Sequence, residues 1–286
     1  MIDRISIVGL GLLGTSVGLA LRAAGYKGEL TGWNRRAEGG TTALKAGAVD
    51  RLGSDPIEAA RASQITVLAV PINATLDLME RLAGVLGPEQ LLTDVGSTKR
   101  LISEAATRLY NQPGRAAFLP GHPMAGKERG GAALADRDLF RSAVWLFTDD
   151  PQAQRSPQAS ALVEEWRSWV AAMGSRMLDL DPARHDELVA WVSHLPQFTA
   201  TALSALLEEQ VGNAPELKDV GGRALREMTR LGSSPFSMWR DIAHTNTEAV
   251  ERALLALEER LALIRENLRT PELRNQFEQA NKFRQE

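Results

Sequence analysis

The sequence predicts an α/β domain with a parallel or mixed sheet, followed by a domain built only from helices. Short apolar runs alternate with helical patterns through the first 181 residues, which is typical of a sheet covered by helices on both faces. After Asp181 only helical patterns remain. We therefore expect one domain over residues 1–181 and a second, all-α domain over residues 182–286.

The composition excludes several kinds of protein. The chain has 286 residues and a formal net charge of −3, which argues against a nucleic-acid or membrane-surface partner held by bulk charge. It has no cysteine, so a disulfide framework, a thiol nucleophile and a cysteine-ligated metal are excluded. We expect a protein without a metal. We also expect it to be cytoplasmic, because the uncharged stretch at residues 5–21 is broken by glycines and lacks the basic start of an export signal.

Seven short apolar runs are expected to be strands. They lie at residues 4–11, 28–34, 64–71, 91–96, 116–121, 143–150 and 176–181. Helical patterns occupy residues 14–25, 55–62 and 159–174 between them. Gly25 should close the first of these helices. Asp55 should cap the second, which has a proline at its first position.

The segment "GLGLLG" joins the first expected strand to the first helix and places Gly9, Gly11 and Gly14 in a GxGxxG pattern. The first glycine permits a tight turn, the second lets a pyrophosphate approach the backbone, and the third lets the helix pack on the strand. The N–H groups that open the helix, including those of Leu12 and Leu13, would then face the phosphates. This segment predicts a Rossmann-like dinucleotide-binding domain.

The end of the second expected strand bears on the choice of dinucleotide. NAD-binding folds usually carry Asp or Glu about 20 residues after the glycines. Here Asn34 lies 20 residues after Gly14 and is followed by Arg35 and Arg36. An amide and two guanidinium groups suit a 2′-phosphate, which a carboxylate would repel. NADP is the expected cofactor, and NAD stays open because the arginines could instead be solvated loop charges.

Two further motifs follow strands and should lie at the carboxyl edge of the sheet, where ligands bind. In "TDVGSTK" (93–99), Ser97 and Thr98 could cap the next helix or offer hydroxyls to an anion or a nicotinamide. In "PGHPMAG" (120–126), His122 is expected in a loop stiffened by prolines. A histidine at such a position favours a functional role.

The helical half adds another histidine. His194 lies in "WVSHLPQFTATAL" (191–203), two residues before Pro196. The proline should kink that helix and free a backbone carbonyl near Val192. The bend could aim the histidine ring inward, or it could serve packing alone.

Three arginines, Arg226, Arg230 and Arg240, lie among apolar residues over 226–246. An arginine held in a cleft favours a carboxylate ligand, because its guanidinium can bond two oxygens at once. The spacing does not decide which of the three would do so.

A regular apolar stripe runs along the last long helical pattern. Its spacings are 4, 3, 4, 3 and 4, and its members are Val250, Leu254, Leu257, Leu261, Ile264 and Leu268. Such a stripe forms one apolar helix face. It could pack in the core or form the seam of a dimer.

These motifs together resemble the prephenate/arogenate dehydrogenase family of tyrosine biosynthesis. The resemblance spans nearly the whole chain, through "GLGLLGTS", "DVGSTK", "GHPMAGKE", "SHLPQ" and "MTRLGSSPFSMW". It implies a dinucleotide-binding domain followed by an all-helical domain that binds substrate and forms a homodimer. It also implies oxidative decarboxylation of arogenate and/or prephenate to tyrosine and/or 4-hydroxyphenylpyruvate, with hydride transfer to a nicotinamide cofactor. The sequence does not distinguish the two substrates.

The resemblance assigns expected roles to five side chains. His122 matches the catalytic histidine that hydrogen-bonds the ring hydroxyl of the substrate, and Ser97 matches a serine that assists there and touches the nicotinamide. His194 matches a histidine of the substrate pocket, and Arg230 matches the arginine that binds a substrate carboxylate. Glu128 falls where related enzymes carry a pocket acid.

Two other classes of protein stay open. Dehydrogenases of the β-hydroxyacid type combine a similar glycine pattern with a helical domain but use a lysine on an interdomain helix, and this chain has no lysine between Lys127 and Lys218. A non-catalytic NADP-binding sensor would keep the glycines but would not need His122, Ser97 and Arg230 together. Formation of reduced nicotinamide in the presence of substrate distinguishes these readings.

Overall fold

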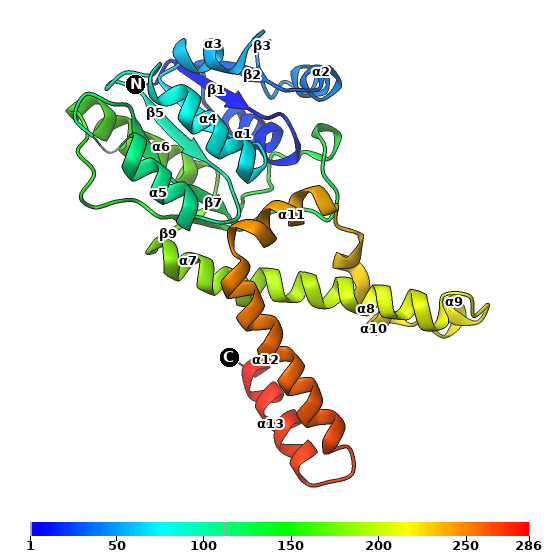
Figure 1. Ribbon diagram of the computed structural model, residues 1–286. Helices are drawn as coiled ribbons and strands as arrows, with labels where there is room; N and C mark the ends of the chain where they lie inside the picture. The colour runs from blue at the N-terminus through cyan, green and yellow to red at the C-terminus, as the bar shows by residue number, and fades with distance from the viewer. Residues whose placement is uncertain (1, 111, 286) are drawn as a thin grey trace.

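A six-stranded sheet forms the centre of the first half of the chain in the computed structural model, which describes residues 2–110 and 112–285 (Figure 1). The strand order is β3-β2-β1-β4-β5-β6, and every neighbouring pair is parallel. The strands are β1 (Arg4–Val8), β2 (Glu29–Trp33), β3 (Arg51–Leu52), β4 (Ile65–Leu68), β5 (Leu91–Asp94) and β6 (Ala117–Leu119). The helices of this half are α1 (Leu12–Ala23), α2 (Ala37–Lys45), α3 (Pro56–Arg61), α4 (Ile72–Ala83), α5 (Arg100–Leu109) and α6 (Pro157–Ala172). This arrangement confirms the predicted Rossmann-like architecture, with the order reversing between β1 and β4.

Helices cover both faces of this sheet. Ile5 and Ile7 of β1 pack in a cluster with side chains of α1 and α6, whereas Val8 packs in a second cluster with side chains of α4 and α5. The same alternation along each strand follows from the two-residue repeat of the side chains. Both faces of the sheet are therefore buried, and the carboxyl ends of the strands form the edge at which ligands bind in this kind of fold.

The later strands form a separate sheet of three strands. It contains β7 (Gly121–Pro123), β8 (Val144–Phe147) and β9 (Arg176–Asp179), with β8 antiparallel to β7 and parallel to β9. His122 pairs with Leu146 in this sheet, so the prediction that His122 lies in a loop is wrong. The chain leaves β6 at Pro120, whose ring removes a backbone donor, and pairs anew one residue later.

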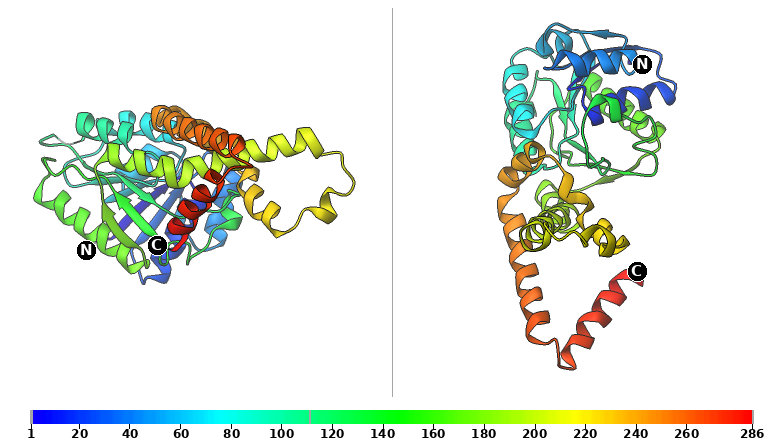
Figure 2. Two further views of the ribbon diagram at one scale, coloured as in Figure 1. Left: turned by 90° about the horizontal axis from the view of Figure 1, so that it is seen from below. Right: turned by 90° about the vertical axis from the view of Figure 1, so that its right-hand side faces the viewer.

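The second half of the described chain is helical, and it begins at Pro182 with Asp181 as the N-cap. Its elements are α7 (Pro182–Val189), a π-helical turn (Ala190–His194), α8 (Leu195–Val211), α9 (Leu217–Val220), α10 (Arg223–Thr229), a 3₁₀ turn (Arg230–Ser233), α11 (Phe236–Thr245), α12 (Thr247–Glu266) and α13 (Glu272–Gln285). Figure 2 shows that α8 and the pair α12–α13 project away from the sheet-containing half. Within residues 2–110 and 112–285, no helix combines the length and the apolar character that crossing a membrane requires.

A π-helical turn lies directly before Pro196, at the place where the sequence predicts a kink. Pro196 lies in the first turn of α8, and the N–H of Leu195 donates to the carbonyl of Ala190, five residues back. A wider turn accommodates a residue that cannot donate to the usual carbonyl. The turn carries His194, whose side chain is buried.

Candidate functional site

The glycine loop shapes the space in front of α1. Gly9 has a φ of +101°, and a Cβ at this position would lie 2.3 Å from the carbonyl oxygen of Ala69. A Cβ at Gly14 would lie 1.9 Å from the carbonyl oxygen of Gly9, so the helix approaches the loop closely. A Cβ at Gly11, the N-cap of α1, would meet nothing within 4 Å. The loop therefore leaves open space at the helix N-terminus, where a pyrophosphate fits.

Asn34 ties the end of β2 to this loop. Its Oδ1 accepts a hydrogen bond from the N–H of Leu10 at 2.9 Å, and its Nδ2 donates to the carbonyl of Arg36 at 2.8 Å. The amide therefore holds the backbone of the loop, and it brings no carboxylate to this edge. Arg35 and Arg36 follow directly and are exposed.

A buried ion pair organises the segment after β5. The carboxylate of Asp94 accepts from the ammonium of Lys99 at 2.6 Å, from the N–H of Gly96 at 2.7 Å and from the N–H of Gly121 at 3.0 Å. Both charged side chains are fully buried. Burial lowers the pKa of Lys99, and the charge of Asp94 opposes that change. This pair fixes the turn that carries Ser97, whose side chain is half-buried.

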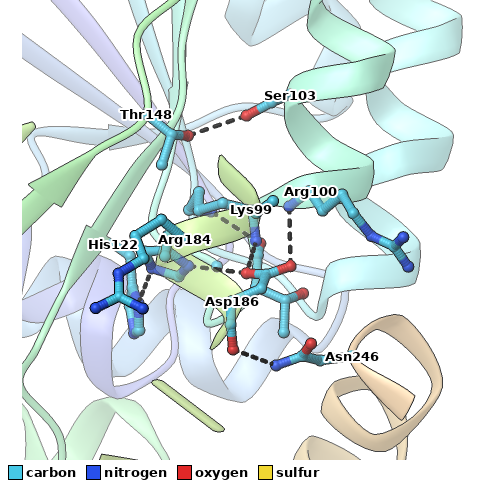
Figure 3. A network of polar contacts seen from close by, with 12 residues as sticks. Lys99, Arg100, Ser103, His122, Thr148, Arg184, Asp186 and Asn246 are labelled. Atoms are coloured by element: carbon cyan, nitrogen blue, oxygen red, sulfur yellow. Dashed lines mark hydrogen bonds and ion pairs between the residues drawn. The ribbon is translucent and has the colours of Figure 1, made fainter. Parts of the chain in front are cut away.

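The N-terminus of α5 is capped from the helical half of the chain. The carboxylate of Asp186 accepts from the N–H of Lys99 at 2.7 Å and from the N–H of Arg100 at 3.0 Å (Figure 3). The expectation that Ser97 or Thr98 could cap this helix is wrong, because Lys99 is the N-cap residue and no local side chain caps it. The hydroxyl of Thr98 instead shares a hydrogen bond of 2.7 Å with Thr245.

His122 lies in contact with this interdomain junction. Its Nδ1 is 2.9 Å from Nε2 of His185, and Nδ1 of His185 is 2.8 Å from Oδ1 of Asp186. Burial holds the pKa of His122 well below its usual value of 6.5, and the nearby His185, Lys99 and His194 lower it further. Burial also lowers the pKa of His185, although Asp186 opposes this. Both rings are therefore neutral near pH 7.

His185 and Asp186 did not emerge from sequence reasoning. Both lie in the first two turns of α7, the first helix of the helical half. A histidine–aspartate pair there, in a chain with only four histidines, is the signal that could have indicated them. Neither residue belongs to one of the motifs that carried the family resemblance.

His194 is almost fully buried on the same side of the junction. Burial lowers its pKa from 6.5 to about 4. Its ring packs edge-on against Trp239, with ring centroids 5.8 Å apart. Asn246 lies 3.4 Å from Nδ1 of His194 and donates to the backbone carbonyl of Asp186 at 2.8 Å. The π-helical turn and the start of α12 are thus joined at this ring.

Of the three arginines considered in the sequence, Arg230 reaches the first half of the chain. It forms an ion pair with Glu128, from the segment after β7. Arg240 pairs with its neighbour Asp241, and Arg226 donates to the carbonyl of Gly221. Arg230 and Glu128 thus come from motifs that are distant in the sequence and are in contact in the structure. The side chain of Arg230 is 60% exposed, so it is accessible from solvent.

Across residues 2–110 and 112–285, no group of three or more histidine, aspartate or glutamate side chains is arranged so that it could hold a metal ion.

The fold and the glycine loop define a protein with a nucleotide-binding α/β domain joined to a helical domain. The family model described as "Prephenate dehydrogenase, nucleotide-binding domain" matches residues 17–173, and the model described as "Prephenate dehydrogenase, dimerization domain" matches residues 181–282. The chain belongs to the prephenate dehydrogenase family.

Individual relatives agree with this assignment. A prephenate dehydrogenase of Bacillus subtilis is 31% identical over 251 residues, which make up 87% of this chain and 66% of the relative. The chain thus spans about two thirds of the length of that relative.

Solved structures agree as well. Prephenate dehydrogenase from A. aeolicus in complex with hydroxyphenyl propionate and NAD+ superposes with a TM-score of 0.87 at 25% identity, covering 100% of this chain and 98% of that one. Synechocystis arogenate dehydrogenase gives a TM-score of 0.76 at 28% identity, covering 99% of each chain.

Proposed function

We propose that the chain catalyses the oxidative decarboxylation of prephenate and/or arogenate in tyrosine biosynthesis, with a nicotinamide cofactor. The observation that carries this proposal is a neutral, buried histidine, His122, at the carboxyl edge of a nucleotide-binding sheet, in contact with His185 of the helical half. The substrate is a cyclohexadienol with a ring carboxylate opposite its hydroxyl. Its oxidation transfers a hydride to the cofactor and releases carbon dioxide, and aromatisation of the ring drives the reaction. A base that accepts the hydroxyl proton as the hydride leaves returns it to the oxygen of the phenol product.

The glycine loop would hold the dinucleotide. The open space at Gly11 and the N–H groups of Leu12, Leu13 and Gly14 at the start of α1 fit a pyrophosphate. Gly9 contributes the turn that aims these groups. When bound, the nicotinamide supplies the hydride acceptor, and the protein contributes orientation and proton handling.

We propose NADP as the preferred dinucleotide, with NAD as the alternative. Support comes from Asn34, which brings no negative charge to the end of β2, and from the exposed Arg35 and Arg36 beside it. Replacing both arginines by alanine should weaken NADP binding relative to NAD by at least about tenfold, because charge-assisted hydrogen bonds to the 2′-phosphate would be lost. Equal changes for both cofactors would contradict this preference.

His122 is proposed to accept the proton of the substrate hydroxyl as the hydride leaves. A neutral imidazole can act as this base, and general-base help contributes roughly 10²–10⁴-fold in rate. Ser97, on the turn fixed by Asp94 and Lys99, is proposed to place its hydroxyl beside the substrate hydroxyl and the nicotinamide.

Arg230 is proposed to bind a carboxylate of the substrate through its planar guanidinium. Glu128 already neutralises this cation, so the incoming carboxylate must join or displace that ion pair. His194 is proposed to form a wall of the pocket together with Trp239, since their rings are in contact.

We further propose that the chain acts as a homodimer formed by its helical half. Val250 at the start of the apolar stripe is buried, whereas Leu261 and Leu268 near its end are 56% and 62% exposed. Phe277 and Phe283 of α13 are 64% and 80% exposed. An exposed apolar surface of this kind is typical of an interface. Sedimentation equilibrium should give twice the mass of the chain, and a monomer would contradict the proposal.

A four-way initial-rate assay tests the function directly. The purified protein is supplied with prephenate or arogenate, each with NAD or NADP, and formation of reduced cofactor is followed by absorbance. A clear preference would identify the substrate and the cofactor together. Cofactor binding without turnover in all four mixtures would refute the dehydrogenase proposal and favour a nucleotide-binding sensor.

A further inference from the structure

Three side chains form a continuous hydrogen-bonded line from the helical half to the sheet-containing half. Asp186 contacts Nδ1 of His185 at 2.8 Å, and Nε2 of His185 contacts Nδ1 of His122 at 2.9 Å. All three residues are buried, with His185 at 0% exposed and His122 at 8%. Water therefore has little access to the three nitrogen atoms inside the line, Nδ1 of His122 and both ring nitrogens of His185, and each of these finds its partner within the line.

The direction of every hydrogen bond in this line follows from the first one. The carboxylate of Asp186 accepts from the backbone N–H groups of Lys99 and Arg100. An ionised carboxylate can only accept, so His185 carries its proton on Nδ1. A neutral imidazole with a proton on Nδ1 has a bare Nε2, and that atom must accept from Nδ1 of His122. The remaining nitrogen of His122, Nε2, is then also bare.

We propose that His185 and Asp186 are positioning residues that hold His122 in the tautomer with a proton on Nδ1 and a bare Nε2. This inference rests on the proposed function, in which Nε2 of His122 receives the proton of the substrate hydroxyl. In that step the O–H bond breaks and an Nε2–H bond forms, while the C–H bond of the hydroxyl-bearing carbon breaks and its hydride goes to the nicotinamide. As the ring carboxylate leaves as carbon dioxide, its bonding electrons aromatise the ring, and Nε2 returns the proton to the oxygen of the phenol. The positive charge that develops on His122 is stabilised through His185 by the negative charge of Asp186.

The other charged groups around the line agree with neutral imidazoles. His122 is faced by the cation of Lys99 and by His194, both of which disfavour its protonated form. His185 is faced by Lys99, which disfavours protonation, and by Asp94 and Asp186, which favour it. Burial is the largest influence on both rings and acts against the charged form.

The line also explains why the base depends on both halves of the chain. Asp186 caps α5 of the first half with the same carboxylate that orients His185. A displacement of the helical half would therefore break the cap of α5 and, at the same time, remove the contacts that fix the tautomer of His122.

Nuclear magnetic resonance of the resting enzyme, labelled with ¹⁵N in its histidines, tests the tautomer without any variant. The chain has only four histidines, and the ¹⁵N shift distinguishes a protonated ring nitrogen from a bare one. Near pH 7 we expect both His122 and His185 to carry their proton on Nδ1. A proton on Nε2 of His122 in the resting enzyme would overturn the proposal.

Variants of His185 test the consequence for catalysis. His185→Phe removes the acceptor and should lower kcat by at least about tenfold, with KM and cofactor affinity nearly unchanged and with the His122 signals shifted towards the Nε2–H form. His185→Gln keeps an acceptor for His122 and a donor for Asp186, and it should recover most of the lost kcat. The exposed His244→Phe is the matched control and should behave as the unmodified protein.

The outcomes separate this proposal from the proposed function. Equal losses in His185→Phe and His185→Gln, or an unchanged tautomer of His122 in His185→Phe, would overturn the role of His185. Absence of turnover in the unmodified protein would refute the proposed function, and the resonance spectrum would still decide the tautomer.

Discussion

The carboxylate of Asp186 lies 2.7 Å from the backbone nitrogen of Lys99, although the two residues are 87 positions apart in the chain. One side chain of the helical half therefore completes the first turn of α5 in the other half. Its second oxygen accepts from Arg100, and the first also meets His185. Asp186 thus connects the two halves of the chain, and through His185 it is also linked to the proposed base, His122.

Removing the carboxylate of Asp186 should destabilise the protein more than removing an exposed helix cap. In Asp186→Ala the buried N–H group of Lys99 and the partly buried N–H group of Arg100 lose their partner, and we expect the free energy of unfolding to fall by about 2–4 kcal/mol. Asp55 caps α3 at an exposed site, so Asp55→Ala should cost only about 0.5–2 kcal/mol. Denaturant titration of both variants measures the difference, and equal losses of stability would contradict a special role of Asp186 in connecting the two halves.

Loss of the proposed base should affect turnover and spare cofactor binding. His122→Asn removes the imidazole that accepts the hydroxyl proton, and kcat should fall at least about a hundredfold. The glycine loop is untouched, so the dissociation constant of the dinucleotide, measured by fluorescence titration, should stay nearly the same. A variant that keeps full turnover would refute the assignment of His122.

The buried histidines predict a loss of stability in mild acid. Burial lowers the pKa of His194 from 6.5 to about 4, so the unfolded chain takes up a proton between these values while the folded chain does not. Since the unfolded state then binds more protons, stability falls as the pH falls, by up to about 1.4 kcal/mol per pH unit for this group.

Comparison of variants isolates this contribution of His194. In denaturant titrations at several pH values between 4 and 6.5, His194→Asn should show a shallower loss of stability than the unmodified protein. His244→Asn, at an exposed position, should follow the unmodified protein. Identical slopes for all three proteins would refute the buried, neutral state of His194.

Replacements in the Glu128–Arg230 ion pair should act on substrate binding in opposite directions. Arg230→Ala removes the proposed carboxylate ligand and should mainly raise KM for the substrate. Glu128→Gln frees the guanidinium, and KM should fall by a factor of about 1.4 to 5, which corresponds to the strength of an exposed ion pair. Initial-rate kinetics measure both effects, and an effect of Arg230→Ala confined to cofactor binding would exclude its proposed role.

Local sequence patterns were sufficient for the start of the site and for five of the six strands of the main sheet, whereas the two-residue strand β3 was not predicted. The glycines of the first loop and the apolar runs act over a few residues, so β1, α1 and the capped α3 could be predicted directly. The candidate roles of His122, Ser97, His194, Arg230 and Glu128 came from the family resemblance, because short motifs preserve the identity of side chains but not their contacts.

Features that depend on contacts between distant residues could not be predicted. The strand containing His122 exists because Leu146 pairs with it, and the cap of α5 comes from a residue of another domain. Pairing and capping of this kind are decided by tertiary structure, which overrides the local signals of Ser97 and Thr98. His185 went unnoticed for the same reason, since its partners are visible only after folding.

The π-helical turn at Ala190–His194 also determines how the chain tolerates changes of length. An α-helix advances about 100° per residue, and this turn contains one residue more than the α-helical turn it replaces. Deleting a single residue there would restore regular α-helical geometry and would leave the side chains of α8 nearly in their present phase relative to α7. Gln197, which bonds the carbonyl of Leu231, would keep facing its partner, whereas a one-residue deletion within the regular turns of α7 would rotate it by about 100° relative to the residues before the deletion.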